Sequence, residues 1–295
     1  MAFLKHLFSL PCFLAAATLF AADAPQRIIS LTPCATDILN ELGISWELIG
    51  VTRYCKPPAT SKPQIIGGFL DPSAETVLSL KPDLLIQADI RDKSFLERMA
   101  KYGIPYVTLF PESYENIKRD IALLGEKTGR RERAQAVLEE WAHTENTIRE
   151  SLRKNPLLSR PRVLILWGEV CAGPQSYLSE AILLCGGINA APGDTARAWP
   201  QLSREKLIMT RSDLIIYVTP DGPEQLSFAP ELADTLKKNP GLAPLPAVRK
   251  RQIYRLNENS RLLYPSPELR KALPQLAEAI RRWAREDIRR LKFKN

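Results

Sequence analysis

Histidine is almost absent from this chain of 295 residues, and its scarcity excludes several kinds of enzyme. One of the two histidines, His6, lies in the apolar N-terminal segment, so His143 alone would remain after cleavage of that segment. A nucleophilic serine or cysteine would have hardly any base to activate it, and a three-histidine metal site is impossible. No CxxC pair occurs, and the turn at residues 31–36 lacks the glycines of a dinucleotide-binding fingerprint. These absences favour a binding protein over an enzyme.

Long apolar runs are also scarce, and the longest stands at the N-terminus. Residues 1–22 contain one strong charge, Lys5, then an apolar core over residues 7–20 and small residues after it. This is the pattern of a cleavable signal peptide, and the run is too short and wrongly flanked for a membrane span. Cys12 lies inside the apolar core, where a lipoprotein cysteine would not stand. The sequence therefore predicts a soluble exported protein.

The chain has no excess of acidic residues and is instead basic. The formal net charge is +8, and loss of Lys5 with the signal peptide leaves +7. The densest basic run covers residues 281–294, where a nucleic-acid-binding patch is conceivable. Export and the interspersed acidic residues favour a solvated helix face, or a general attraction to acidic surfaces. We therefore expect no nucleic-acid partner.

Residues 129–155 are predicted to form one long helix, because glycine and proline are absent after Gly129. Apolar residues recur at steps of three and four, among them Ala134, Trp141 and Ile148. Asn155 ends the helix, because the residue before a proline is disfavoured in the α conformation. The helix would be roughly 40 Å long, which is too long for an ordinary crossover within one sheet. The pattern alone favours a surface helix of a single domain, but the flanking segments argue otherwise.

The segments on either side of this helix repeat each other. Residues 75–86 and 205–216 both read glutamate, apolar residues, a basic residue, a helix-stopping residue, aspartate and an apolar run. The offset is constant, since Glu205 follows Glu75 by 130 positions and the two aspartates are equally far apart. Each unit is a short helix, a basic turn and a buried strand of the parallel-sheet type. We predict an α/β fold of two Rossmann-like lobes with parallel sheets, joined by one long rigid α-helix.

This interpretation divides the chain into a signal peptide (1–22), an N-terminal α/β lobe (23–128), an inter-lobe helix (129–155) and a C-terminal α/β lobe (156–295). The mature chain is long enough for two lobes with separate cores. Strands are expected at residues 27–31, 48–51, 84–87, 106–110, 163–167, 214–218 and 253–256. The other helices are expected near residues 35–42, 73–80, 93–102, 113–125, 176–184, 204–210, 230–238 and 267–291.

Four cysteines would survive cleavage: Cys34, Cys55, Cys171 and Cys185. Cys34 follows the first predicted strand and Cys55 follows the second, and loops at one edge of a parallel sheet can be neighbours. An exported chain can oxidise such a pair. A Cys34–Cys55 disulfide and two free buried thiols both remain open.

Aromatic residues follow several predicted strands, at the edge where open parallel sheets bind ligands. With two lobes, these edges can face each other across a cleft. Each aromatic alone is more often core or surface chance, but together they would suit a large, flat, partly apolar ligand. The aromatic candidates are Tyr54, Phe69, Trp167, Trp199 and Tyr264, and the polar candidates are Asp89, Arg91, Arg197, Glu258 and Arg261.

Glu75 and Glu205 each begin a short predicted helix. An acidic residue in the first turn is favoured by the helix dipole, which explains each glutamate singly. It leaves open why both lobes carry one at the same place. Two exposed carboxylates, one on each lobe, could dock onto a two-fold partner that bears arginines.

Several of these stretches resemble the periplasmic substrate-binding proteins for vitamin B12, haem and iron–siderophores. In the first half they are residues 27–37, 50–58 and 80–86, and in the second half residues 185–189, 199–205 and 265–267. The resemblance spans nearly the whole mature chain, and residues 199–205 are most similar to the vitamin B12-binding members. It implies the class III architecture of two lobes with a single helical hinge and little closure on binding. It also implies a periplasmic location and delivery of the ligand to an ABC transporter.

The same resemblance assigns roles to single residues. Tyr54, Phe69, Trp167 and Trp199 match aromatic cleft positions, whereas Glu75 and Glu205 match the carboxylates that meet permease arginines. The sequence departs from the vitamin B12-binding pattern at Ala88, where a tryptophan is usual, and in the loop at residues 257–264.

We therefore expect a monomeric receptor that captures a corrinoid, vitamin B12 or cobinamide, and delivers it to an ABC transporter permease dimer. A haem or ferric-siderophore receptor is the alternative within the same class. An exported enzyme is less favoured, because no pair of acidic residues has a catalytic spacing. We expect no catalytic residue, no cofactor and no metal site.

Overall fold

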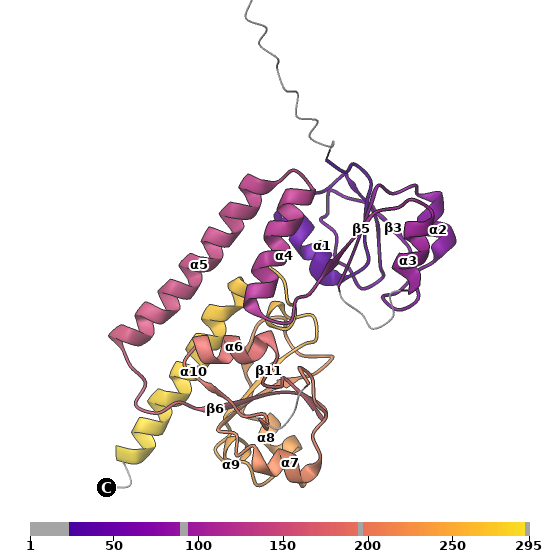
Figure 1. Cartoon of the computed structure of the whole chain (residues 1–295). Helices are drawn as coiled ribbons and strands as arrows, with labels where there is room; N and C mark the ends of the chain where they lie inside the picture. Colours follow the sequence, from indigo (N-terminus) through magenta and orange to yellow (C-terminus); the bar gives the residue numbers. More distant parts are fainter. Residues whose placement is uncertain (1–23, 89–93, 194–196, 293–295) are drawn as a thin grey trace, which may run out of the picture.

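The computed structural model describes residues 24–88, 94–193 and 197–292, and these form two α/β lobes (Figure 1). The signal peptide expected at residues 1–22 and two polar candidates, Asp89 and Arg91, lie outside the described residues. Within the described ranges, no helix is both long and apolar enough to cross a membrane.

The N-terminal lobe is built on five parallel strands in the order β3-β2-β1-β4-β5. The strands predicted from the sequence are present within one or two residues of their expected ends, whereas the exposed two-residue strand β3 was missed. The strands are β1 (Ile28–Ser30), β2 (Leu48–Val51), β3 (Gln64–Ile65), β4 (Leu84–Ala88) and β5 (Tyr106–Leu109). The helices are α1 (Pro33–Glu41), α2 (Ala74–Ser79), α3 (Ser94–Lys101) and α4 (Tyr114–Lys127).

The C-terminal lobe has a six-stranded sheet that is parallel at its centre and antiparallel at its edges. The expectation of parallel sheets is therefore wrong at β7 and β10. β7 turns back on β6 through a two-residue connection, in which Gly168 takes the left-handed φ of +55° that such a tight turn requires. The strands are β6 (Arg162–Trp167), β7 (Val170–Cys171), β8 (Ile188–Asn189), β9 (Leu214–Val218), β10 (Ser227–Phe228) and β11 (Ile253–Leu256). The helices are α6 (Tyr177–Leu184), α7 (Arg204–Met209), α8 (Leu232–Leu236), α9 (Pro246–Arg249), the 3-10 turn η1 (Arg261–Leu263) and α10 (Leu269–Lys292).

The sequence repeat is also a repeat of backbone structure. Lys81 ends the turn after α2 with φ of 47°, and Arg211 does the same after α7 with φ of 45°. In the first lobe Asp83 accepts a hydrogen bond from the backbone N–H of Arg27, and in the second lobe an aspartate accepts one from Arg162. Each arginine side chain in turn donates to a carbonyl at the end of the neighbouring short helix. In both lobes, therefore, a left-handed residue, an aspartate and an arginine connect a short helix to a central strand in the same way.

The two lobes have separate cores, as expected, and in addition share a third one, which was not expected. Alternate residues of β1 face opposite sides: Ile28 belongs to the largest apolar cluster, and Ile29 belongs to a cluster confined to the first lobe. In β6, Val163 and Leu164 divide in the same way between the largest cluster and one confined to the second lobe. The largest cluster runs from β1 to Ala284 of α10. Because it packs like a protein interior, it opposes relative movement of the two sheets.

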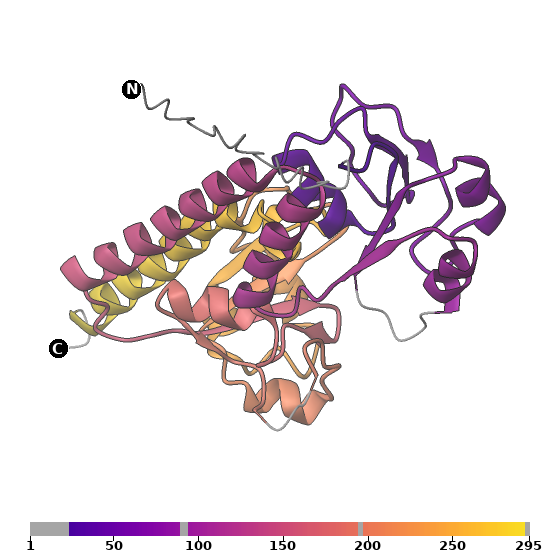
Figure 2. The ribbon, with the colours of Figure 1, turned by 45° about the horizontal axis from the view of Figure 1, so that its top comes forward.

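The helix that joins the lobes is α5 (Arg131–Lys154), which has 24 residues and a length of roughly 36 Å. It lies beside α10 on the side of the molecule away from α2 and α7 (Figure 2). Trp141 is fully buried at its middle and packs edge-on against Tyr114 of α4, with ring centroids 5.5 Å apart. The connection is therefore a packed layer of three helices.

Charged side chains tie the start of α10 to the first lobe. Arg270, with 4% of its side chain exposed, donates to Glu41 of α1 at 3.0 Å and to Glu140 of α5 at 2.5 Å. Lys271 and Arg133 also pair with Glu41. Burial alone would raise the pKa of Glu41, but hydrogen bonds with Glu268, Lys271 and Arg270 outweigh it and lower the pKa to about 2. The carboxylate is therefore ionised at neutral pH and holds three helices together.

Candidate functional site: a cleft between the lobes

Three adjoining hollows lie where the carboxyl ends of the two sheets face each other. They hold about 440, 600 and 500 Å³, and Pro33 and Tyr264 line all three. Each volume lies in the range of small-molecule sites. We name them the aromatic compartment, the Tyr54 compartment and the hinge-side compartment, in that order, and together they form the cleft.

The aromatic compartment contains most of the ring surface predicted from the sequence. Phe69 and Phe110 contribute from the first lobe, and Trp199 and Tyr264 from the second. Of the described residues that line this compartment, Glu112 alone is charged. The remaining lining residues are Thr32, Pro33, Cys34, Ala88, Pro111, Tyr177, Ala198, Leu263 and Pro265. This hollow can hold a flat apolar surface from both lobes at once.

Trp199 is positioned by the backbone of the strand β7 region. Gly173 N donates to Ala198 O at 2.8 Å, and Cys171 N donates to Pro200 O at 3.0 Å. A Cβ on Gly173 would lie 2.4 Å from Arg197 O, so only glycine allows this close approach. The indole of Trp199 is still 41% exposed. The loop therefore presents a fixed aromatic surface to the cleft.

Trp167 supports Trp199, and it is not among the residues that line the three hollows. The two indoles meet edge to face at a centroid distance of 5.5 Å, and Tyr177 meets Trp199 from another side at 5.8 Å. Tyr177 is buried, and its hydroxyl donates to Leu263 O, which fixes the loop before Tyr264. The structure thus gives Trp167 a supporting position in place of the predicted ligand contact, and adds Tyr177 to the lining.

Phe69 projects from a tight turn between β3 and α2. Gly67 takes a φ of +116°, and the chain pairs with itself between Gly67 and Pro72. Gly67 O also accepts a hydrogen bond from Arg53 N at 2.9 Å, which ties this turn to the loop that carries Tyr54. The two aromatic candidates of the first lobe therefore come from linked loops.

The Tyr54 compartment is more polar than the aromatic compartment. Tyr54 is 56% exposed, and the Arg53 guanidinium lies 5.8 Å from its ring centroid. Arg53 also pairs with Asp71 at 3.0 Å. The predicted Glu258 lines this compartment, together with Lys56.

The hinge-side compartment is lined by carboxylates and basic groups from both lobes. Burial raises the pKa of Asp37 to about 6; a hydrogen bond with Ser266 and the charge of Lys56 oppose this rise, and the charges of Glu268 and Glu41 add to it. The predicted Arg261 lines this compartment and pairs with Glu268 at 2.8 Å. Arg197, by contrast, is exposed and lies outside the lining of all three hollows.

The four described cysteines are free, so the Cys34–Cys55 disulfide weighed from the sequence is not formed. Cys34 Sγ lies 3.1 Å from Thr32 Oγ1, and Cys55 Sγ lies 3.1 Å from Thr52 Oγ1. Burial raises the pKa of Cys34 to about 12. Each sulfur is therefore held as a buried thiol by a hydroxyl of its own loop.

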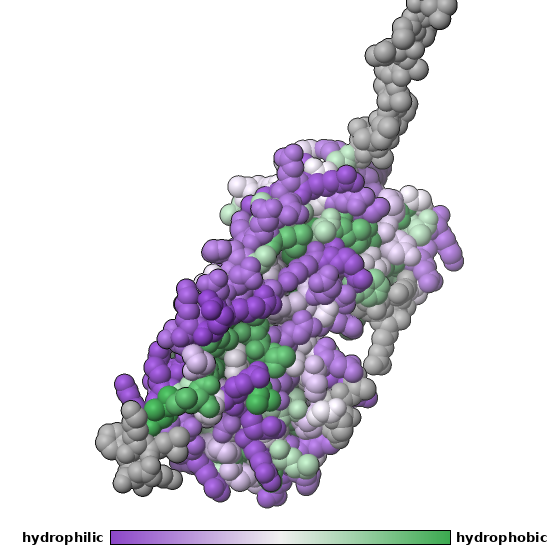
Figure 3. All heavy atoms as spheres, turned by 60° about the vertical axis from the view of Figure 1, so that its left-hand side comes forward, coloured by the Kyte–Doolittle hydropathy of each residue, from purple (hydrophilic) through white to green (hydrophobic). Residues whose placement is uncertain are grey.

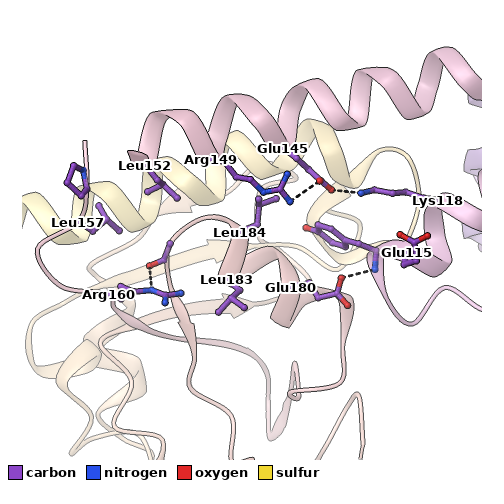
Figure 4. Close-up of a pocket in the computed structure, with 13 residues that line it drawn as sticks. Glu115, Lys118, Glu145, Arg149, Leu152, Leu157, Arg160, Glu180, Leu183 and Leu184 are labelled. Atoms are coloured by element: carbon purple, nitrogen blue, oxygen red, sulfur yellow. Dashed lines mark hydrogen bonds and ion pairs between the residues drawn. The ribbon is translucent and has the colours of Figure 1, made fainter. Parts of the chain in front are cut away.

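A further hollow of about 740 Å³ lies outside the cleft on the hinge side, between α4, α5 and α6 (Figure 4). On this side, hydrophobic side chains gather in patches on a mostly hydrophilic face (Figure 3). Glu145 is buried at its edge and accepts hydrogen bonds from Lys118 at 2.7 Å and Arg149 at 3.0 Å. Glu180 accepts one from Tyr114 N at 2.9 Å. These polar groups hydrogen-bond to neighbouring protein groups. We interpret the hollow as a gap in the packing between the hinge helices and the second lobe.

Glu75 and Glu205 are exposed at equivalent places in the two lobes. Ser73 caps α2 and Ser203 caps α7, and each accepts a hydrogen bond from the backbone N–H three residues later. A hydrogen bond with its own backbone N–H and one with Ser203 lower the pKa of Glu205. Both glutamates are exposed, so their carboxylates face solvent.

Two α/β lobes, a packed helical connection and a ligand-sized cleft between them define a two-lobed solute-binding protein. The chain belongs to the periplasmic binding protein family, whose profile matches residues 28–259. A vitamin B12-binding protein of Yersinia pseudotuberculosis is 29% identical over 204 residues, which cover 67% of this chain and 71% of that protein.

Two solved structures are similar over nearly the whole described chain. The apo form of the periplasmic heme-binding protein RhuT from Roseiflexus sp. RS-1 has a TM-score of 0.73 and 26% identity, and the match covers 88% of this chain and 99% of that one. The periplasmic vitamin B12-binding protein BtuF of Vibrio cholerae has a TM-score of 0.71 and 22% identity, with 88% and 98% covered. Membership of the periplasmic binding protein family makes the chain a substrate-binding protein of an ABC importer and not an enzyme.

Sequence reasoning missed several residues of the cleft, chiefly Pro33, Phe110, Pro111, Tyr177 and Leu263. Phe110 could have been found, because it is the last residue of a predicted strand and so lies at the edge where ligands bind. Tyr177 gave no such signal, since it lies in the first turn of a helix and looks like an ordinary core residue.

Proposed function

We propose that this protein captures a corrinoid in the cleft and delivers it to an ABC transporter. The observation that carries the proposal is the aromatic compartment, in which Phe69, Trp199 and Tyr264 surround a hollow whose lining has one charged residue. A corrinoid has a broad ring edged with neutral amide groups. Such a ligand can stack on aromatic side chains without a cation for each substituent.

Haem is the runner-up ligand, and the Tyr54 compartment favours it. A tyrosine oxygen can ligate haem iron, and Tyr54 is 56% exposed at this compartment. Haem also carries two propionates, which need cationic partners. The cationic groups there are partly engaged, since Arg53 pairs with Asp71 and Lys56 lies 3.9 Å from Glu224. The charge of the cleft therefore supports a corrinoid over haem.

The two exposed glutamates support a position for the surface that docks onto the transporter. Glu75 and Glu205 lie on α2 and α7, one at the outer part of each lobe and both away from the hinge helix α5 (Figure 1). A two-fold permease dimer with arginines on its outer face would meet both carboxylates at once. The apolar N-terminus at residues 1–22 supports export, and we infer that the mature protein acts as a periplasmic monomer.

Isothermal titration with cyanocobalamin, cobinamide, haemin and a ferric catecholate tests the ligand. We expect stoichiometric binding of one or both corrinoids. Binding of haemin alone, with iron absorption bands that disappear in Tyr54→Phe, would establish the runner-up. Heat from neither corrinoid, together with no competition between corrinoid and another ligand, would refute the proposal.

A pair of tryptophan variants tests the site within the same titration. Trp199→Ala should lower corrinoid affinity 10- to 100-fold, which is about 1.4–2.8 kcal/mol, because it removes a stacking surface from the cleft. The matched control is Trp46→Ala, since Trp46 is 68% exposed and lies outside the cleft lining. Equal affinity of both variants would place the ligand elsewhere.

A further inference from the structure

We propose that the C-terminal lobe docks onto the transporter through apolar contacts that its N-terminal counterpart lacks. The surface is formed by Glu205, Ile208 and Met209 of α7. The inference rests on the proposed docking by the two glutamates, and it concerns what surrounds them.

The three residues share one face of α7, because positions three and four apart are neighbours on a helix. Leu207 is 3% exposed and points into the core of the second lobe, which fixes the opposite face outward. On that outward face Met209 is 71% exposed and Ile208 is 38% exposed. Two large apolar side chains therefore stand in water beside an exposed carboxylate.

The equivalent face of α2 exposes no methionine, and its leucine is partly buried. The repeat offset of 130 pairs Glu75 with Glu205, and it pairs Leu78 with Ile208 and Ser79 with Met209. Leu78 packs against the apolar cluster of the first lobe, and Ser79 is exposed. The two helices have the same backbone features: each begins with a serine cap and is followed by a turn with a left-handed residue. On this face the second lobe therefore has the exposed Met209 where the first lobe has the exposed Ser79.

The occupant that fits this face is the permease dimer of the importer. It is the macromolecular partner that membership of the family implies, and a carboxylate flanked by apolar groups matches an arginine set in an apolar surface. Leu70 is also exposed near α2 in sequence, but it lies on the turn before the helix and is not the counterpart of Met209. We infer that the C-terminal lobe contributes the larger share of docking affinity.

A two-fold symmetric partner would present the same surface to both lobes. If both permease subunits present the same apolar hollow, the first lobe leaves its hollow unfilled because it offers Ser79. Ser79→Met should then fill the second hollow and strengthen docking.

Uptake by spheroplasts of the source cells, deleted for the native receptor gene, tests this. The spheroplasts receive purified receptor loaded with labelled cyanocobalamin, or haemin if only that binds, and the half-saturating receptor concentration is measured. We expect Met209→Ser to raise this concentration at least fivefold, and Ser79→Met in the same chain to restore at least part of the loss. Leu158→Ser is the control, because Leu158 is 80% exposed on the loop between α5 and β6, and its change should have no effect.

The double variant Glu75→Gln/Glu205→Gln separates this inference from the docking proposal on which it rests. If the double variant weakens uptake while Met209→Ser leaves it unchanged, the apolar contact is refuted and docking by the glutamates stands. If the double variant also has no effect, the docking surface itself is wrong. Titration of the ligand into each variant must give the affinity of the unmodified receptor, which shows that the fold is intact.

Discussion

Removing the buried guanidinium of Arg270 should loosen the connection between the lobes. Arg270→Met keeps much of the side-chain volume but deletes the hydrogen bonds to Glu41, Glu140 and Pro267 O. Glu41 has only 11% of its side chain exposed, so it would keep a buried charge with fewer partners. Breaking one side of a buried pair costs about 3–5 kcal/mol. Because Lys271 still pairs with Glu41 at 2.6 Å, we expect the lower end, about 3 kcal/mol.

The loss should depend on pH in a defined direction. The pKa of Glu41 is lowered to about 2 in the folded protein, so its contribution is complete above the unfolded value of about 4.5 and is lost as pH falls toward 2. Arg270→Met should therefore cost most at pH 7 and progressively less at pH 4 and pH 3. Urea unfolding at each pH measures the difference, and thermal unfolding at pH 7 should show a Tm lowered by roughly 6–12 °C.

A matched surface variant and a double-mutant cycle make the test decisive. Arg285 pairs with Glu278 on the exposed part of α10, with 58% of each side chain exposed. Arg285→Met should cost at most about 1 kcal/mol. Adding Glu41→Gln to Arg270→Met should cost less than the sum of the single changes, because the unpaired charge is gone. A loss for Arg270→Met equal to that of Arg285→Met would refute the view that this buried cluster locks the lobes.

Three further outcomes follow from the cleft and its supports. Asp37→Asn should raise the free energy of unfolding by up to about 3 kcal/mol at pH 7.5 and leave it nearly unchanged at pH 4. The reason is that burial raises the pKa of Asp37 to about 6, so stability is lost as pH rises through that value, and an equal effect at both pH values in urea titrations would contradict this. Gly173→Ala should weaken ligand binding at least tenfold by pushing the Trp199 loop away, whereas Gly193→Ala, which meets nothing within 4 Å, should leave the titration unchanged. The four thiols of the mature chain should resist alkylation at pH 8 in the native state and all react in denaturant without reductant, because they are free and buried; only two reactive thiols there would indicate a disulfide.

The sequence by itself determined the number of lobes, most strands and the helix that joins them. These features depend on local periodicity and on the repeat around Glu75 and Glu205. The two copies of this repeat are separated by a constant offset in the sequence. Central strands were found because they are continuous apolar runs. The edge strands β3, β7 and β10 have two residues each, so they carry no periodic signal and depend on the partner strand that they meet.

The tertiary structure decided how the lobes are held together and which aromatic side chains face the cleft. Arg270 and Glu41 lie 229 positions apart, and no local pattern relates them. Trp167 and Trp199 looked equivalent in the sequence, since both were aromatic candidates at loop positions facing the predicted cleft, but packing placed one behind the other. Side-chain direction at a loop is set by the loops that pack against it, here through the close approach at Gly173. Spacing along the chain could therefore locate the cleft, whereas its lining was fixed by contacts between segments that are distant in the sequence.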